Sequence, residues 1–245
     1  MSYVVHGCGI VTVWFGNWNG LELDSDYTYT DISFGSTPAN AYALAKDGAG
    51  EFYVFTTTGV SKYDTTYAAI TTWGVGGVAS VASALLSTTG RPLKVGDNKQ
   101  IVASTLGISV NLHTFTSAGV TLWSKAIATG HGCSAVAFLP SGNVVAGVGT
   151  GAGTTLNTFQ EYNGTTGAVT FTYSGISMRT NEWTTGQAMC VTSAGELIYG
   201  GSGNTGSKIA KYTVGASTPV WTTSLGSTAL QSFSGPGGFL YVIGS

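Results

Sequence analysis

The sequence is poor in charged residues. Asp, Glu, Lys and Arg make up 8% of its 245 residues, whereas an ordinary soluble domain has about 25%. With 9 basic and 11 acidic residues the formal net charge is -2, so no basic stripe is available to neutralise the phosphates of a nucleic acid. Binding to nucleic acid is therefore disfavoured, and Ser, Thr, Asn and Gly must cover most of the surface.

Long apolar runs, a leader peptide and a cysteine framework are also missing. The longest apolar stretch, residues 75–86, is interrupted by Gly and Ser and is shorter than the roughly 20 residues that cross a bilayer. The N-terminus has no positive segment ahead of its apolar residues, so we expect neither a classical signal peptide nor membrane insertion. The three cysteines, Cys8, Cys133 and Cys190, are an odd number spread over the chain, which is typical of thiols in a reducing compartment.

What the sequence does contain is a repeat. A short apolar run, a tight turn and a second apolar run recur along the chain, and these residue types tolerate the positive φ of tight hairpins. The five turns are Asp47-Gly48, Asp97-Asn98, Ser141-Gly142, Ala194-Gly195 and Pro236-Gly237. The pattern predicts five β-hairpins.

A second pair of strand-like runs follows each hairpin and closes on an aromatic residue. In four units these runs occupy residues 59–73, 109–123, 158–171 and 208–221. The partner of the fifth hairpin lies at the other end of the chain, in residues 10–23. We therefore expect two N-terminal strands to complete the sheet that two C-terminal strands begin.

The ends of these runs are evenly spaced. Leu23, Trp73, Trp123, Phe171 and Trp221 stand 48 to 50 residues apart, and 47 residues join the last to the first around the two termini. Near-equal units thus tile the chain as a circle, which removes the exposed sheet edge at the seam. The predicted units are residues 32–73, 74–123, 124–171, 172–221, and 222–245 together with 1–31.

The repeat is similar to those of β-propellers. Residues 161–171 (EYNGTTGAVTF) and 61–73 (SKYDTTYAAITTW) resemble the outer hairpins of WD40-like and quinone-enzyme-type repeats. The resemblance implies an all-β fold, a five-bladed β-propeller in one domain whose closing blade is shared between the N- and C-termini. A two-sheet sandwich is the alternative, although it predicts no circular period. Residues 77–94 are either the inner strand of the second unit or an insertion.

In such a ring, the loops between one blade and the next gather around the mouth of the axial channel, where ligands are usually met. The expected loops are residues 24–41, 74–92, 124–133, 173–187 and 225–230. The fourth brings Arg179, Glu182 and Trp183 together, either as an aromatic platform for a sugar ring or partner protein or as an ion pair beside an aromatic plug.

Further candidate binding residues stand in the first and third loops. Tyr27, Tyr29 and Asp31 either contact a ligand or complete turns through local hydrogen bonds, and His131 precedes the third inner strand. His-Gly-Cys occurs at residues 6–8 and 131–133, but the ring would hold these copies too far apart for one zinc ion. We therefore expect no metal and no cofactor.

Catalytic constellations are not evident. The inner strands carry no paired carboxylates of the glycosidase type, and no Ser, His and acid can be linked from the sequence, so we expect no enzyme. Low charge, abundant small residues and a closed β ring resemble, in style, structural proteins of tailed bacteriophages. This implies a virion component, assembled in the host cytoplasm, that binds other virion proteins or a host-surface glycan or protein. The alternatives are a carbohydrate-binding lectin or receptor-binding module, and a bacterial interaction scaffold.

Overall fold

The computed structural model describes most of the chain from residue 43 onward and three short segments before it. The described residues are 11–13, 19–23, 29–33, 43–81, 93–105, 112–126, 133–148, 155–179, 188–192, 194–203, 206–225, 229–234 and 240–244. Every regular element among them is a β-strand. In this part of the chain no helix is long and apolar enough to cross a membrane.

The strands form four antiparallel sheets of four strands each, and each strand pairs with its neighbour in sequence. The first sheet contains β4 (Ala43–Lys46), β5 (Phe52–Phe55), β6 (Gly59–Tyr63) and β7 (Val78–Ser80). The second contains β8 (Leu93–Val95), β9 (Ile101–Ser104), β10 (Leu112–Phe115) and β11 (Thr121–Lys125). The third contains β12 (Cys133–Phe138), β13 (Val144–Val148), β14 (Thr155–Tyr162) and β15 (Val169–Arg179). The fourth contains β16 (Ala188–Val191), β17 (Leu197–Gly203), β18 (Gly206–Tyr212) and β19 (Trp221–Leu225).

Two smaller sheets stand at the ends of the chain. The N-terminal sheet contains β1 (Val11–Val13), β2 (Asn19–Leu23) and β3 (Tyr29–Ser33), and the C-terminal sheet contains β20 (Ala229–Ser234) and β21 (Leu240–Gly244). The predicted pairing of the two runs in residues 10–23 is confirmed, since Val11 stands opposite Glu22. The N-terminal sheet nevertheless has three strands, one more than expected.

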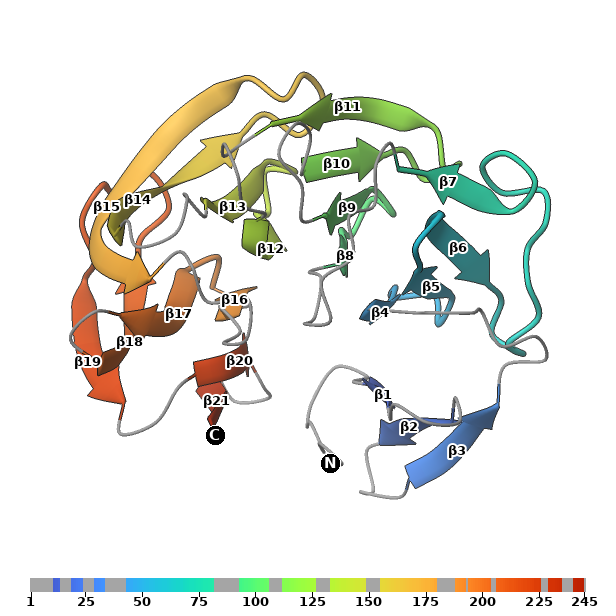
Figure 1. Cartoon of the computed structure of the whole chain (residues 1–245), viewed down its shortest axis with the longest axis horizontal. Helices are drawn as coiled ribbons and strands as arrows, with labels where there is room; N and C mark the ends of the chain where they lie inside the picture. The colour runs from blue at the N-terminus through green and yellow to red at the C-terminus, as the bar shows by residue number, and fades with distance from the viewer. Residues whose placement is uncertain are drawn as a thin grey trace.

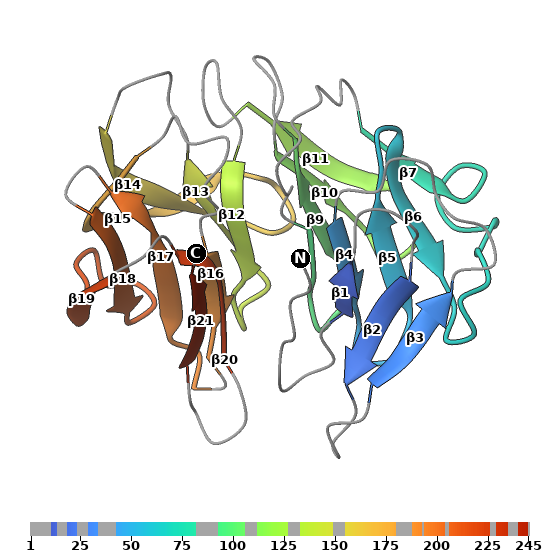
Figure 2. The same cartoon turned by 60° about the horizontal axis from the view of Figure 1, so that its bottom comes forward.

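The sheets are arranged radially along an arc. Figure 1 shows the first strand of each four-stranded sheet nearest the middle and the fourth strand at the outside. Figures 1 and 2 both place the C-terminal sheet beside the fourth sheet and the N-terminal sheet beside the first. The N-terminal and C-terminal sheets therefore lie at the two ends of the arc.

Four of the predicted hairpin turns are confirmed, because β4–β5, β8–β9, β12–β13 and β16–β17 are antiparallel pairs joined by them. At one position in each turn the backbone enters the left-handed region, at Gly50, Lys99, Gly142 and Gly195. Glycine adopts this conformation at low cost, and the second turn uses a lysine there. The strands of the fifth hairpin, β20 and β21, also pair, while its turn at Pro236-Gly237 lies outside the described residues.

The prediction that the fourth strand of the first sheet ends at Trp73 was wrong. The Asp64 carboxylate accepts hydrogen bonds from the backbone N–H groups of Thr66 and Ala68, which turns the chain directly after β6. Further turns follow, and the fourth strand, β7, begins only at Val78. The uncertain segment 77–94 thus contains an outer strand of one sheet and, from Leu93, the inner strand of the next.

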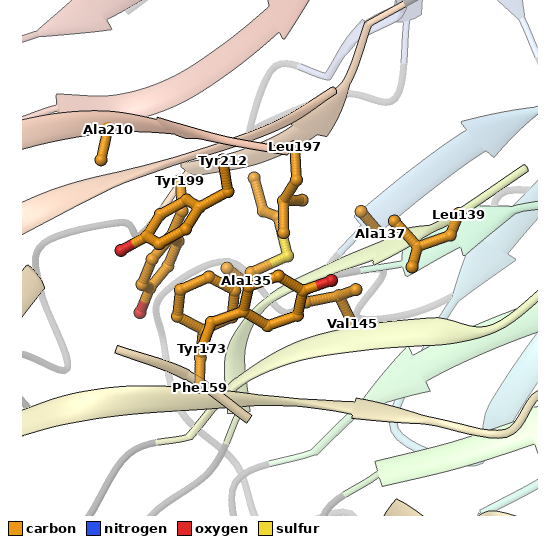
Figure 3. Close-up of a cluster of buried hydrophobic side chains, with 11 residues drawn as sticks. Ala135, Ala137, Leu139, Val145, Phe159, Tyr173, Leu197, Tyr199, Ala210 and Tyr212 are labelled. Atoms are coloured by element: carbon orange, nitrogen blue, oxygen red, sulfur yellow. The ribbon is translucent and has the colours of Figure 1, made fainter. Parts of the chain in front are cut away.

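The apolar cores lie between consecutive sheets. Phe159 in the third sheet stacks on Tyr173 with ring centroids 4.7 Å apart, and it meets Tyr199 and Tyr212 of the fourth sheet at 4.7 and 5.1 Å (Figure 3). Similar clusters join the first sheet to the second and the second to the third. Because second strands have a neighbouring sheet on each face, their residues are buried without alternation, as in Phe52–Phe55.

Polar pairs recur beside these cores, at the residue that precedes each second strand. Glu51 accepts a hydrogen bond from Lys62 at 2.8 Å, Asn143 donates to Glu161 at 2.6 Å, and Glu196 pairs with Lys211 at 2.7 Å. In the second sheet Gln100 instead donates to the carbonyl of Gly164 in the third sheet, at 2.6 Å. These pairs connect strands and sheets, so they belong to the scaffold.

Candidate interaction surface

The residues predicted from sequence to bind a ligand lie mainly outside the described part of the chain. This holds for Tyr27, His131, Glu182 and Trp183. Tyr29 and Asp31 are strand residues of β3, opposite Leu23 and Leu21 of β2. The expected loop over residues 24–41 was thus wrong for residues 29–33.

Arg179 is the last residue of β15, opposite Thr155 of β14. The expected loop over residues 173–187 was therefore wrong for residues 173–179, which continue the outer strand of the third sheet. The loop predicted over residues 74–92 likewise contains β7. The structure describes none of the side chains of the seven predicted site residues, so the site at the channel mouth stays a prediction.

A different candidate surface is formed by exposed apolar residues on the outer strands. Among the residues whose side chains the structure describes, every exposed large hydrophobic residue lies on an outer strand or in the turn that leads to one. These residues are Val75, Val120, Leu122, Val169, Val214, Val220 and Trp221. Figure 1 shows β11, β15 and β19 along the periphery of the arc. These exposed apolar side chains thus lie along the periphery, on strands or turns of four different sheets.

These outer strands are also sheet edges. β7, β11, β15 and β19 are each the last strand of a described sheet, so one side of each backbone faces away from its own sheet. An edge strand presents unpaired N–H and C=O groups to a further strand. Proteins usually protect such edges with Lys, Pro or other charged residues.

Charge is scarce on the outer strands. Among their described side chains Lys125 is the only charged one. Its ammonium group donates to the carbonyl of Gly167 at 2.6 Å and lies 5.4 Å from the ring centre of Tyr162, so it is held against the third sheet. The exposed remainder, such as Thr170 and Thr172 beside Val169, is uncharged. This surface can therefore meet another uncharged β-strand without electrostatic repulsion.

A buried histidine stands next to this surface. His113 on β10 places Nδ1 3.0 Å from the Ser124 hydroxyl and Nε2 3.3 Å from the Thr105 hydroxyl. Burial lowers the pKa of His113 to about 4, so the imidazole is neutral at pH 7. Both ring nitrogens of His113 thus face hydroxyl groups, whereas in a hydrolase triad one of the two ring nitrogens binds a carboxylate. The group accordingly ties β10 to its neighbouring strands.

The outer surface is not recognisable from the sequence because its apolar residues alternate with threonine. That alternation is equally typical of a strand with one covered face. The one usable signal was the absence of Lys and Glu from residues 169–174 and 220–225, which a protected edge strand would contain.

No protein-family model matches this chain, and no curated protein is similar enough to it in sequence to count as a relative. The function therefore rests on the surface itself.

Proposed function

We propose that this chain is a non-enzymatic structural component, of the kind that builds virions, which docks to neighbouring proteins through the outer strands of its sheets. The observation that carries the proposal is the presence of exposed apolar residues on the edge strands of four sheets, where Lys125 is the one charged residue among the described side chains. Strand addition at such an edge gives affinity through backbone hydrogen bonds and specificity through the side chains between them. The partners are other virion proteins or a host-surface protein or glycan.

The fold that we propose for this role is a five-bladed β-propeller. The four complete sheets would be four blades, and the fifth would combine β20 and β21 with N-terminal strands. The radial order of the strands in every four-stranded sheet (Figure 1) supports this arrangement, as does the spacing of 48 to 50 residues between units. Such a ring leaves each outer strand at the rim, where partners can reach it.

Low charge supports the assembly role independently of the fold. A protein that stays apart from its neighbours relies on surface charge for colloidal stability, and this chain has 20 charged residues in 245. Fixed neighbours in an assembly make that protection unnecessary. The lectin alternative depends on Trp183, whose surroundings are not described.

Light scattering over a dilution series tests the proposal. We expect the purified chain to form a defined oligomer, or to aggregate until a partner from the same source is added. A clean monomer at high concentration would contradict the assembly role and would direct the search to glycan binding.

Matched variants locate the contact. Val169→Lys and Leu122→Lys add a positive charge to the outer strands, where the wild-type side chains are 46% and 37% exposed. We expect each to raise the concentration at half-association at least about tenfold, equivalent to about 1.4 kcal/mol. Ala49→Lys adds the same charge to an exposed hairpin turn and should leave association unchanged. Equal effects of all three variants would mean that net charge, and not the outer strands, governs association.

A further inference from the structure

The first strands of the four complete sheets carry charge of one sign. Figure 1 shows these strands, β4, β8, β12 and β16, nearest the middle of the arc. They contain two lysines, Lys46 and Lys94, and no Asp or Glu. The Lys46 ammonium group lies 5.3 Å from the ring centre of Phe52 on β5, so it is held over its own sheet. Lys94 is therefore the charged side chain that these strands can present to a ligand.

Lys94 points away from the core beside it. It is the middle residue of β8, and its neighbours Leu93 and Val95 pack in the core between the first and second sheets. Because side chains alternate along a strand, Lys94 lies on the opposite face. Its side chain is exposed to solvent, and β8 is the strand of the second sheet nearest the middle of the arc (Figure 1). The exposed side chain thus lies at the inner side of the sheets.

Protein surrounds this exposed side chain. Burial lowers the pKa of Lys94, because it disfavours the charged ammonium form. Exposure and a desolvation cost occur together when a group faces solvent that protein encloses on several sides. Lys62 and Lys99 both bind the carboxylate of Glu51, whereas Lys94 has no ion pair or hydrogen bond with a described residue. No carboxylate of the described chain therefore offsets the cost of placing its charge there.

A thiol from the fourth sheet faces the same region. Cys190 is a partly exposed residue of β16. Its neighbours Met189 and Val191 pack in the core between the third and fourth sheets, so Cys190 lies on the other face of the strand. β12 contacts both β8 and β16, and Lys94 is near enough to Cys190 for electrostatic attraction between them. A cation and a thiol from two different sheets therefore share one solvent-facing region.

We infer that Lys94 and Cys190 form a binding site for the carboxylate group of a small ligand, at the inner side of the sheets. One ammonium group matches the single negative charge of a carboxylate, whereas a phosphate dianion would keep a charge without a counterion. The thiol can donate a weak hydrogen bond to the same group. A bound carboxylate would supply the negative charge that the described surroundings of Lys94 lack. This site is separate from the outer strands and goes beyond their docking role.

Alkylation of Cys190 tests the charge of the site. The full-length chain is treated with iodoacetate, which carries a carboxylate, or with neutral iodoacetamide, and mass spectrometry quantifies the peptide that contains Cys190. The ratio of the two rate constants is divided by the ratio in the urea-unfolded chain. Both reagents attack the same thiolate, so the ratio is independent of how much thiolate is present. We expect folding to favour iodoacetate about threefold, the attraction of one nearby ammonium group acting through solvent.

Three lysine variants assign the charge. Lys94→Gln should abolish the preference for iodoacetate, and Lys94→Arg, which keeps the charge, should retain it. Lys46→Gln is the matched control, because it removes the same charge from another first strand and should leave the ratio unchanged. If Lys94→Gln does not fold, about 1 M sodium chloride should abolish the preference in the wild type, since it screens charges beyond about 3 Å. A preference that survives in Lys94→Gln, or an equal loss in Lys46→Gln, would overturn the inference.

Protection by acetate tests the class of ligand. Sodium acetate should slow the reaction of iodoacetamide with Cys190 about twofold when its concentration equals its dissociation constant. The comparison is made with sodium chloride at the same ionic strength, and Lys94→Gln should show no protection. Equal slowing by acetate and chloride would indicate screening without a carboxylate site, and stronger slowing by inorganic phosphate would assign the site to phosphate. Either result would overturn the inference.

Discussion

Replacing Glu51 by glutamine removes the centre of the densest charge cluster in the described chain. One carboxylate oxygen of Glu51 accepts hydrogen bonds from Lys62 at 2.8 Å and from Lys99 at 2.7 Å. Lys62 belongs to the same sheet, whereas Lys99 comes from the hairpin turn of the second sheet. The Lys62 side chain is only 10% exposed, so the variant leaves a nearly buried ammonium group without its carboxylate.

The expected loss of stability follows from the pKa of the carboxyl group. The hydrogen bond from Lys62, followed by that from Lys99, lowers the pKa of Glu51 from 4.5 to about 2. A shift of that size corresponds to about 3 kcal/mol when undamped. The Glu51 side chain is 20% exposed, and Lys99 keeps a contact with Asp47 at 3.5 Å. Allowing for screening by solvent, we expect Glu51→Gln to lower the free energy of unfolding by about 1.5 kcal/mol at pH 7.

The pH dependence gives a second test of the same reasoning. A carboxyl group with a lowered pKa in the folded state stabilises the protein above its unfolded pKa and loses this effect as pH falls. For Glu51 the loss runs from about pH 4.5 down to about pH 2. The stability difference between wild type and Glu51→Gln should therefore be full at pH 7 and shrink across this interval.

Urea unfolding at a series of pH values measures both quantities. Glu196→Gln is the matched control, because the Glu196 carboxylate has a single ion-pair partner among the described residues, Lys211, and the two side chains are 36% and 25% exposed. We expect that variant to lose no more than about 0.5 kcal/mol. Equal losses for the two variants, or a Glu51 difference that persists at pH 2, would refute the reasoning.

Two further perturbations address the outer rim and the buried histidine. Gly167→Ala should lower the free energy of unfolding in urea by at least about 2 kcal/mol, because the added Cβ would lie 2.7 Å from Trp123. Gly215→Ala should lower it by about 1 kcal/mol, because Gly215 also has a positive φ but an added Cβ there would meet no atom within 4 Å. Similar losses for the two variants would show that the overlap with Trp123 is unimportant. The NMR signals of His113 should show a neutral imidazole down to about pH 5, since burial lowers its pKa to about 4. The resulting contribution to stability should be present above pH 6.5 and lost as pH falls toward 4. Titration of the His113 signals near pH 6.5 would contradict this reasoning.

The hairpins were predictable because their signals are local. A turn such as Ser141-Gly142 needs one residue in the left-handed region, and the residue types that accept it are visible in the sequence. The outer strands were harder to predict. The Asp64 turn displaces β7 to Val78, although residues 67–73 have the apolar and aromatic pattern of a strand. Strand β3 was assigned to a loop because Asp, Ser and Thr around Tyr29 also favour turns.

The candidate surface could not be predicted because exposure depends on a neighbouring sheet. Trp73 and Trp221 both end strand-like runs in the sequence, yet one is 5% and the other 38% exposed. What distinguishes them is whether an outer turn of another sheet lies against the ring, which is a property of the assembled sheets.

The sequential packing of the sheets has a consequence for synthesis. Each complete sheet is one continuous stretch of chain, and its apolar core is shared with the sheets made just before and just after it. Contacts of this kind join residues about one repeat apart, as in the 44 positions between Trp73 and Ser117, and domains generally fold from the N-terminus as they leave the ribosome. Each sheet can therefore dock on its predecessor during translation. In the five-bladed ring proposed above, the pairing of β20 and β21 with N-terminal strands would follow after all four complete sheets.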